Sequence, residues 1–309
     1  MIDQQKLRPF LPLELLARQV VEGFITGLHK SPFHGFSVEF AEHRIYNSGE
    51  STRHIDWKLF GRTEKLFTKR FEEETNLRCR IIIDNSSSMY YPEVKDLPRD
   101  GFSKITFSVY AAAALIQLLK KQRDAVGLSL FSDKVELHSQ AKSTTVHHKY
   151  LFNELEKIVS AAETKISRKK TFAVESLHGI AENIHHRSLV VMFSDMMENS
   201  SDIQNLLAAL QHLRHNKHEV ILFHVFDGKK EIDFDFENRP YRFIDMETGE
   251  ELKLTPSEVR DDYRKSVSEL QKTLLLKCGQ YHIDFIRADV NKGLTQILLP
   301  YLLKRIRMQ

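Results

Sequence analysis

The feature that most constrains the fold is a run of three isoleucines followed by an acid, Ile81-Ile82-Ile83-Asp84. An uninterrupted apolar run of this kind is typical of a parallel strand buried on both faces, with the carboxylate at its C-terminal end. A second apolar run, 188–194, is also followed by an acid, Asp195, and a third covers 220–226. Segments with helical periodicity separate these runs. The alternation predicts an α/β, Rossmann-like fold in which a mostly parallel sheet is flanked by helices.

The main domain is expected to cover residues 77–309. Its strands are predicted at 77–84, 124–131, 134–138, 188–194, 220–226 and 282–287. Its helices are predicted at 103–123, 146–164, 173–186, 201–216, 257–277 and 292–307. An insertion at about 229–255 contains a predicted hairpin of 232–236 with 241–246, and Ser257 is expected to cap the helix that follows.

Residues 1–76 have a different pattern. A helix is predicted over 8–30, strands over 32–40 and 66–74, and a short helical turn at 53–57. Such a β-rich segment is too small to fold alone. We therefore expect the N-terminal helix and this segment to pack on the main domain.

Composition narrows the class of protein. The chain has 41% hydrophobic and 28% charged residues, as ordinary globular proteins have, and its net charge of +3 offers little attraction for nucleic acid. The basic residues within 53–70 are offset by Glu64 and by three glutamates at 72–74.

Cysteine usage and hydropathy bear on the compartment. The chain has two cysteines, Cys79 and Cys278, each in or beside an apolar segment, which is typical of reduced, packed thiols. No apolar signal segment opens the sequence, and its longest nearly apolar run, 109–119, is far shorter than the ~20 residues of a membrane span. We therefore expect a soluble, cytoplasmic protein without a membrane span.

Oxygen-bearing side chains gather around Asp84. Ser86 and Ser88 follow at alternate positions, so the Asp-x-Ser-x-Ser loop offers one carboxylate and two hydroxyls. Oxygen ligands of this kind suit a hard divalent cation such as Mg²⁺. A Ser-rich turn that only closes the strand is the alternative interpretation, because Asn and Ser side chains bond to nearby backbone in turns.

Two further segments favour the metal interpretation. Carboxyl ends of parallel strands meet at one edge of a sheet, where ligands bind, so Asp195 is expected beside Asp84. Thr171 lies in the loop before the helix that leads to the Asp195 strand and can reach the same edge. The alternatives to Thr171 are Ser143, Thr144 and Thr145. The predicted metal ligands are Asp84, Ser86, Ser88, Thr171 and Asp195.

This ligand set resembles the metal-ion-dependent adhesion site (MIDAS) of von Willebrand factor A domains, and the expected order of strands and helices resembles their fold. The resemblance implies that Ser86 and Ser88 coordinate Mg²⁺ directly and that Asp84 and Asp195 do so directly or through water. Thr171 coordinates the ion in one state of the site and not in another. The alternative ions are Mn²⁺ and Ca²⁺. One coordination position stays open, and in A domains an acidic side chain of a partner fills it.

The upstream segment resembles the signature of the bacterial family known as domain of unknown function 58 (DUF58), in which such a segment precedes a von Willebrand A-type core. The residues that carry this resemblance are Gly35, Phe40, Arg44, Tyr46, Gly49, Arg53, Ile55, Asp56, Trp57 and Arg62, with 245–250 as a downstream link. Members are typically encoded beside MoxR-type AAA ATPases and are taken to act as their partners. Many carry N-terminal membrane spans, which this sequence does not show.

Three positions differ from these patterns. Lys170 before Thr171 and Met196 after Asp195 stand where Gly is usual, and Glu50 stands where the DUF58 signature usually has Asp. None of the three changes removes a ligand oxygen, although Lys170 brings a positive charge to its loop.

The resemblance implies recognition by the metal site rather than catalysis. We expect a metal-dependent protein-interaction module, not an enzyme, that serves a MoxR-type AAA ATPase as adaptor or substrate recruiter. The alternative is a metal-dependent hydrolase or phosphoesterase at the same site, because a metal with an open position can act as a Lewis acid. Phosphoryl transfer on Asp84 requires a second acid two residues later, where Ser86 stands. The histidine pairs 147–148 and 185–186 are expected at the surface, since adjacent rings on a helix point apart.

Overall fold

The computed structural model describes residues 12–29, 43–46, 57–69, 77–93, 101–163, 173–185, 187–196, 200–215 and 217–308. The chain divides into two compact units. The larger consists of Met1–Val21 with Leu77–Gln309, and the smaller is Glu22–Asn76. Helix α1 (Leu13–His29) begins in the larger unit and ends in the smaller one.

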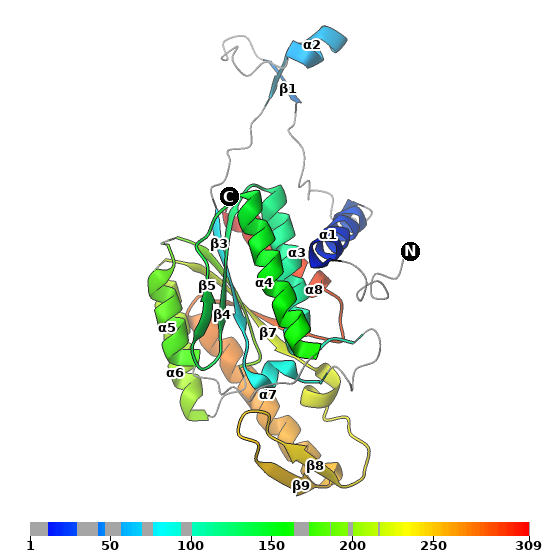
Figure 1. Cartoon of the computed structure of the whole chain (residues 1–309), viewed down its shortest axis with the longest axis vertical. Helices are drawn as coiled ribbons and strands as arrows, with labels where there is room; N and C mark the ends of the chain where they lie inside the picture. Colours follow the sequence, from blue (N-terminus) through cyan, green and yellow to red (C-terminus); the bar gives the residue numbers. More distant parts are fainter. Residues whose placement is uncertain are drawn as a thin grey trace. The chain divides into compact units, whose positions relative to one another are not determined.

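A six-stranded sheet forms the centre of the larger unit (Figure 1). Its strands, in spatial order, are β10 (Asp284–Asp289), β7 (Glu219–Phe226), β6 (Leu189–Ser194), β3 (Arg78–Asp84), β4 (Ala125–Phe131) and β5 (Val135–His138). All neighbouring pairs are parallel except β4 and β5, which form an antiparallel hairpin. The predicted α/β fold with a mostly parallel sheet is confirmed.

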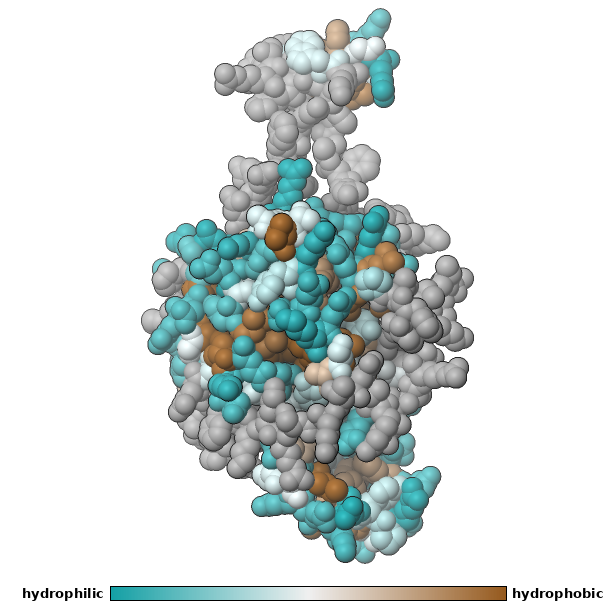
Figure 2. All heavy atoms as spheres, viewed as in Figure 1, coloured by the Kyte–Doolittle hydropathy of each residue, from teal (hydrophilic) through white to brown (hydrophobic). Residues whose placement is uncertain are grey.

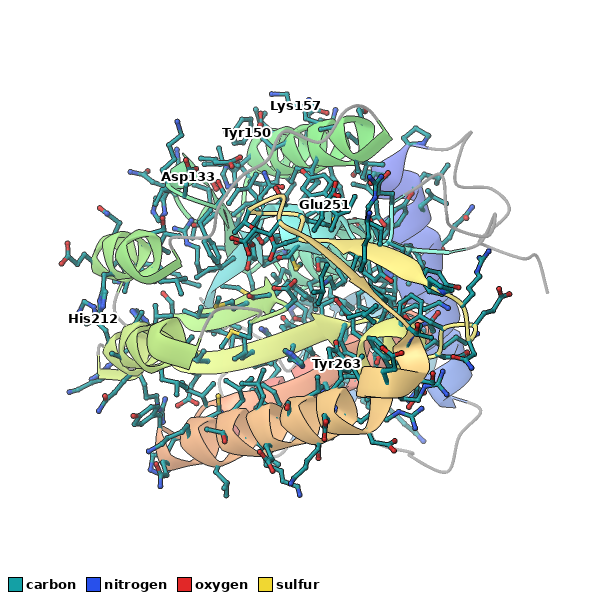
Figure 3. The ribbon with its side chains drawn as sticks, turned by 90° about the horizontal axis from the view of Figure 1, so that it is seen from below. Asp133, Tyr150, Lys157, His212, Glu251 and Tyr263 are labelled. Atoms are coloured by element: carbon teal, nitrogen blue, oxygen red, sulfur yellow. The ribbon has the colours of Figure 1, made fainter. Side chains whose placement is uncertain are left out.

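Helices cover both faces of this sheet. One layer contains α3 (Lys104–Lys121), α4 (Thr145–Glu163) and α8 (Thr295–Met308). The opposite layer contains α5 (Ala173–Asn183), α6 (Ser200–His215) and α7 (Pro256–Gln280). Figure 3 shows the two layers from below, with α4, which carries Tyr150 and Lys157, on one side of the sheet and α7, which carries Tyr263, on the other.

Burial on both faces explains the continuous apolar runs of the sequence. The three isoleucines 81–83 are fully buried in β3, between the two helical layers. The four alanines 111–114 are fully buried on α3, and their small side chains allow this helix to lie close to the sheet. Both cysteines are buried and free. In Figure 2 hydrophilic residues prevail on the described surface of this unit, with hydrophobic residues over its middle and at its β8–β9 end.

The insertion after β7 differs from the prediction. Strand β8 (Tyr241–Ile244) pairs antiparallel with β9 (Glu251–Leu254), whereas 232–236 was expected as its partner. The chain instead leaves β7 through a π-helical turn, Gly228–Ile232. The phenylalanines of 232–236 pack their rings on Phe243, which satisfies their apolar character without strand pairing.

Two smaller predictions also differ from the structure. Thr255, not Ser257, immediately precedes α7, and Pro256 occupies the first helical position, which its fixed φ favours. His148, expected at the surface, is buried on α4, because it lies on the apolar side of this helix, which faces the core of the larger unit.

The smaller unit contains short elements. Strand β1 (His43–Ile45) pairs antiparallel with β2 (Phe67–Lys69), and α2 (Trp57–Thr63) lies between them in the sequence. The predicted strand at 32–40 and most of the helical turn predicted at 53–57 lie outside the described residues. None of the helices in the described ranges combines the length and apolarity that a bilayer crossing requires.

Candidate functional site

Asp84 lies at the C-terminal end of β3, where the strand order of the sheet reverses. From β3 the chain continues to β4 on one side and later to β6 on the other. Ligands of open parallel sheets bind at such a switch point. The side chain is 2% exposed. Its Oδ1 accepts the N–H of Ser86 at 3.0 Å, and its Oδ2 accepts the hydroxyl of Ser194 at 2.8 Å.

The loop after β3 brings two serine hydroxyls together. Ser86 has an extended backbone and precedes a single 3₁₀ turn, Ser87–Tyr90. The hydroxyl oxygens of Ser86 and Ser88 are 3.0 Å apart. Tyr90 donates its hydroxyl to Asn85 Oδ1 at 2.8 Å, which fixes the loop internally. Ser86 is buried and Ser88 is half-buried, so the pair extends from the interior toward solvent.

Asp195 follows β6, the neighbour of β3. The register of the two strands sets Ser194 level with Asp84 and Asp195 one residue beyond it. The Ser194 hydroxyl also accepts the N–H of Met196 at 3.1 Å, so it links the two loops. Met196 has a left-handed backbone with φ of 52°, a conformation that favours glycine. Its side chain is buried in the core, and this packing offsets the backbone strain.

Two charged residues that the sequence reasoning missed lie at the same edge. Lys104, the first residue of α3, is 1% exposed, and its Nζ lies 2.8 Å from Asp195 Oδ2 and 2.5 Å from Glu231 Oε1. Glu231, in the turn after β7, is 13% exposed, and its Oε2 accepts the N–H of Asp227 at 2.7 Å. A sequence signal existed, because Lys104 is the one charged residue between 101 and 119. A charge in so apolar a segment requires a partner.

Burial and like charge act together on Asp84. Burial raises the pKa of its carboxyl, and the negative charge of Asp195 raises this pKa further. Hydrogen bonds from Ser86 and Ser194 lower the pKa in part, because they favour the ionised form. A positive charge placed between the two aspartates relieves both the burial cost and the repulsion.

The remaining ionisable groups at this edge are a lysine, a histidine and a glutamate. Burial lowers the pKa of Lys104, but the attraction of Asp195 and Glu231 outweighs burial and raises it, so the ammonium stays charged. Burial lowers the pKa of His224 to about 4, which keeps this imidazole neutral. Burial raises the pKa of the Glu231 carboxyl, and the charge of Lys104 offsets part of this rise. Three carboxyl groups therefore share one ammonium at this edge.

These oxygens fit a hard divalent cation. Carboxylates and hydroxyls are the ligands that such ions prefer, and a cation beside the two aspartates favours their ionised form. Among the described residues, no group of three or more His, Cys, Asp or Glu side chains is placed to hold a metal. A cation bound to Asp84 and Asp195 therefore needs serine hydroxyls and water to complete its coordination.

The threonine of the predicted set is not placed by the structure. Thr171 and Lys170 lie outside the described residues. The alternatives to Thr171, at 143–145, directly follow Lys142, which forms a β-bridge with Val126 near the start of β4. Asp84 lies level with Phe131 at the other end of that strand, about 16 Å away at the usual rise of a strand. The alternatives are thus at the wrong edge of the sheet.

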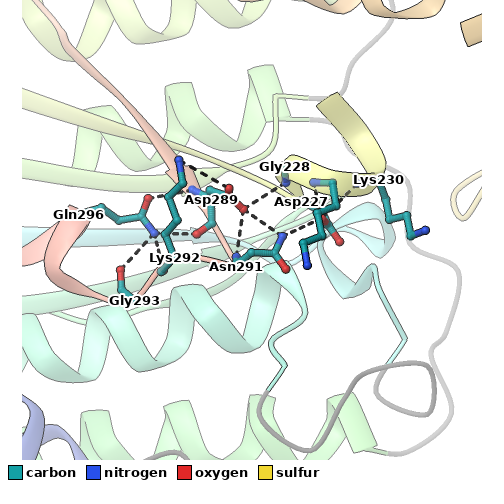
Figure 4. Close-up of polar contacts among 9 residues, drawn as sticks. Asp227, Gly228, Lys230, Asp289, Asn291, Lys292, Gly293 and Gln296 are labelled. Atoms are coloured by element: carbon teal, nitrogen blue, oxygen red, sulfur yellow. Dashed lines mark hydrogen bonds and ion pairs between the residues drawn. The ribbon is translucent and has the colours of Figure 1, made fainter. Parts of the chain in front are cut away.

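Two more aspartates stand at strand ends but have backbone partners. Asp227 follows β7, and its Oδ1 accepts the N–H groups of the next turn, while Asp289 ends β10 and its Oδ1 accepts the N–H of Gly228 at 3.1 Å (Figure 4). Asn291 donates its amide to both aspartates, at 2.8 and 3.1 Å. This network fixes the turn that carries Glu231. These carboxylates therefore shape the edge of the site.

The predicted signature residues belong to the smaller unit. Arg44 lies in β1, and Tyr46 follows this strand, half-buried. Trp57 and Arg62 are exposed on α2. The signature residues outside the described ranges are Gly35, Phe40, Gly49, Arg53, Ile55 and Asp56.

Fold and site together define an α/β protein whose mostly parallel sheet gathers two aspartates and two serines at its switch point. A family model described as "Protein of unknown function DUF58" matches residues 42–273. The match covers well over half of the chain, so the chain belongs to the DUF58 family, as its upstream signature predicted.

Relatives of similar length occur in mycobacteria. The uncharacterized proteins Rv1480 of Mycobacterium tuberculosis and Mb1516 of Mycobacterium bovis are each 22% identical over 268 residues, which cover 86% of this chain and 80% of theirs. Among solved structures, BatB of Bacteroides thetaiotaomicron is 12% identical with a TM-score of 0.45, over 75% of this chain and all of that one. An aerotolerance-related membrane protein of Bacteroides fragilis is 15% identical with a TM-score of 0.45, over 72% and 97%.

Proposed function

We propose that the chain is a metal-dependent protein-interaction module with a von Willebrand A-like domain. The site at the switch point binds Mg²⁺, with Mn²⁺ or Ca²⁺ as alternatives, and through it a carboxylate of a partner protein. The supporting observation is that Asp84 and Asp195 flank the switch point beside the paired hydroxyls of Ser86 and Ser88. In the proposal Thr171 is the fifth ligand. The ion supplies a positive charge and one open coordination position, which the carboxylate of the partner occupies.

Recognition is favoured over catalysis by the groups around Asp84. The position two residues later, where phosphoryl transfer would require an acid, holds Ser86. Lys104 is protonated and ion-paired, and the pKa of His224 is lowered to about 4 by burial, so neither readily accepts a proton near neutral pH. A screen for phosphoesterase and peptidase turnover with Mn²⁺ tests this choice, and turnover that disappears in Asp84→Ala would replace recognition by hydrolysis.

The partner in this proposal is a MoxR-type AAA ATPase or its substrate, and the chain acts in the cytoplasm as adaptor or recruiter. Membership of the DUF58 family supports this part, together with the resemblance of the site to an adhesion site. Co-purification of the tagged chain from its own bacterium, with and without a chelator, tests it. A MoxR-type ATPase that is recovered only without the chelator is the expected result.

Calorimetry tests the metal site directly. Titration with Mg²⁺ or Mn²⁺ is expected to give saturable heat for the intact chain and none for Asp84→Ala, because this change removes a carboxylate at the centre of the site. Asp261→Ala, which removes an exposed carboxylate from α7, is the matched control and is expected to bind like the intact chain. Absence of heat with the intact chain, or equal heat in both variants, would refute the metal site.

A further inference from the structure

Lys104 brings a permanent positive charge to one of the two aspartates of the site. Its ammonium lies 2.8 Å from Asp195 Oδ2 and 2.5 Å from Glu231 Oε1, and the side chain is almost completely buried. The backbone N–H of Lys104 donates to Tyr91 O at 2.9 Å, which ties the start of α3 to the loop after β3. The ammonium is thus a fixed part of the site.

Neither helix stability nor core stability explains this lysine. A cation in the first turn of a helix is unfavourable, because the N-terminus of the helix dipole is positive. A buried ion pair in general contributes little net stability, because both charges lose their hydration. Lys104 therefore stands against the local preference of its helix, which is the kind of conflict found at functional sites.

Glu231 offers the ammonium a second carboxylate in a fixed place. Its Oε2 accepts the N–H of Asp227, and Asp227 Oδ1 in turn accepts the N–H groups of Lys229 and Lys230 at 3.0 and 3.2 Å. The turn Gly228–Ile232 is also bound to Asp289 of β10 (Figure 4). Glu231 thus keeps its position whether or not Asp195 has another partner.

We propose that Lys104 is a resident cation that competes with a divalent ion for Asp195, and that Glu231 keeps the ammonium when the ion binds. This inference rests on the proposed function and adds its regulation. When a divalent ion approaches Asp195, the two positive charges repel each other, so Lys104 lowers the affinity of the site. Glu231 limits that repulsion, because its carboxylate lies 2.5 Å from the ammonium and offsets the positive charge.

The two residues therefore have opposite effects on metal affinity. Lys104→Met keeps the length of the side chain and removes the competing charge, so Mn²⁺ is expected to bind roughly tenfold more tightly or better. Glu231→Gln leaves Asp195 as the one carboxylate that pairs with the ammonium within the described ranges, and Mn²⁺ is expected to bind more weakly by a similar factor. In the Lys104→Met background, the same Glu231→Gln change is expected to weaken binding less, since no ammonium remains to be neutralised.

Calorimetric titration with Mn²⁺ alone, on the full chain and these three variants, is the test. Lys120→Met is the matched control, because Lys120 lies on the same helix and pairs with Glu14 at 2.6 Å, and its affinity is expected to stay unchanged. Melting without metal, followed by circular dichroism, verifies folding and is expected to show Lys104→Met as less stable, since two carboxylates lose their counter-charge.

The outcomes separate this inference from the proposed function. If the intact chain binds no Mn²⁺, the proposed function fails. If the intact chain binds and Lys104→Met binds equally or more weakly, the competing role of Lys104 is refuted while the metal site stands. If Lys104→Met does not fold, Glu231→Gln decides, and an affinity equal to that of the intact chain refutes the inference.

Discussion

The ion pair between Asp124 and Arg305 should be a main anchor of the C-terminal helix. Asp124 precedes β4 and is fully buried, and its Oδ2 lies 2.5 Å from the guanidinium of Arg305 on α8, which is 7% exposed. The buried Tyr301 lies on the same helix. Asp124→Asn keeps the shape of the side chain but removes the negative charge that lies against the buried guanidinium. Removal of one partner of such a pair costs about 3–5 kcal/mol of unfolding free energy.

Urea unfolding followed by far-ultraviolet circular dichroism measures this loss. With a slope of about 3 kcal/mol per molar urea, the unfolding midpoint should fall by about 1–1.7 M. Circular dichroism is the suitable signal, because the helices and strands of the larger unit dominate it, whereas the one tryptophan, Trp57, belongs to the smaller unit. Asp133→Asn, at an exposed site, is the control and should change the free energy by less than about 0.5 kcal/mol.

A double variant tests the physical reason for the loss. Asp124→Leu with Arg305→Met removes both charges and keeps apolar volume, so it should recover most of the stability that Asp124→Asn loses. If the double variant is as unstable as the single one, the cost does not come from an unpaired buried charge. A loss below about 1 kcal/mol in Asp124→Asn would also refute the reasoning.

Two further predictions concern thiols and pH. Burial raises the pKa of both Cys79 and Cys278 to about 12, so the native chain should react with iodoacetamide only after urea unfolding, as mass spectrometry of alkylated peptides can show. Burial lowers the pKa of His148 below its usual 6.5, helped by the charges of Lys120 and His147, so the unfolded chain binds this proton more readily. Stability should therefore fall as the pH drops below about 6.5, and His148→Asn should flatten the decrease between pH ~7 and ~5 in urea unfolding. An unchanged pH profile in His148→Asn, or rapid alkylation of the native chain, would contradict the two predictions.

Much of the fold could be predicted because burial on both faces leaves a strong trace in the sequence. The runs that became β3, β6 and β7 are continuous and apolar, and each strand begins and ends within about two residues of the predicted bounds. The segment after β7 was harder to predict. Residues 232–236 alternate as a strand does, but their phenylalanines pack on Phe243, and the pairing strand lies at 251–254. Alternation predicts which side chains become buried, but it does not predict against which strand or ring they pack.

The sequence by itself determined the fold class, the family and the meeting of Asp84, Ser86 and Asp195 at one edge, because carboxyl ends of parallel strands lie together. Only the tertiary structure decided what surrounds them. The hydroxyl of Ser194 donates to Asp84. Lys104 pairs with Asp195, which is 91 residues away in the sequence, and with Glu231, which is 127 residues away. Local periodicity carries no record of such contacts, because a buried charge takes its partner from whichever element packing brings near it. The sequence therefore predicted which of these residues meet at the edge of the sheet, but it did not predict how their charges are paired.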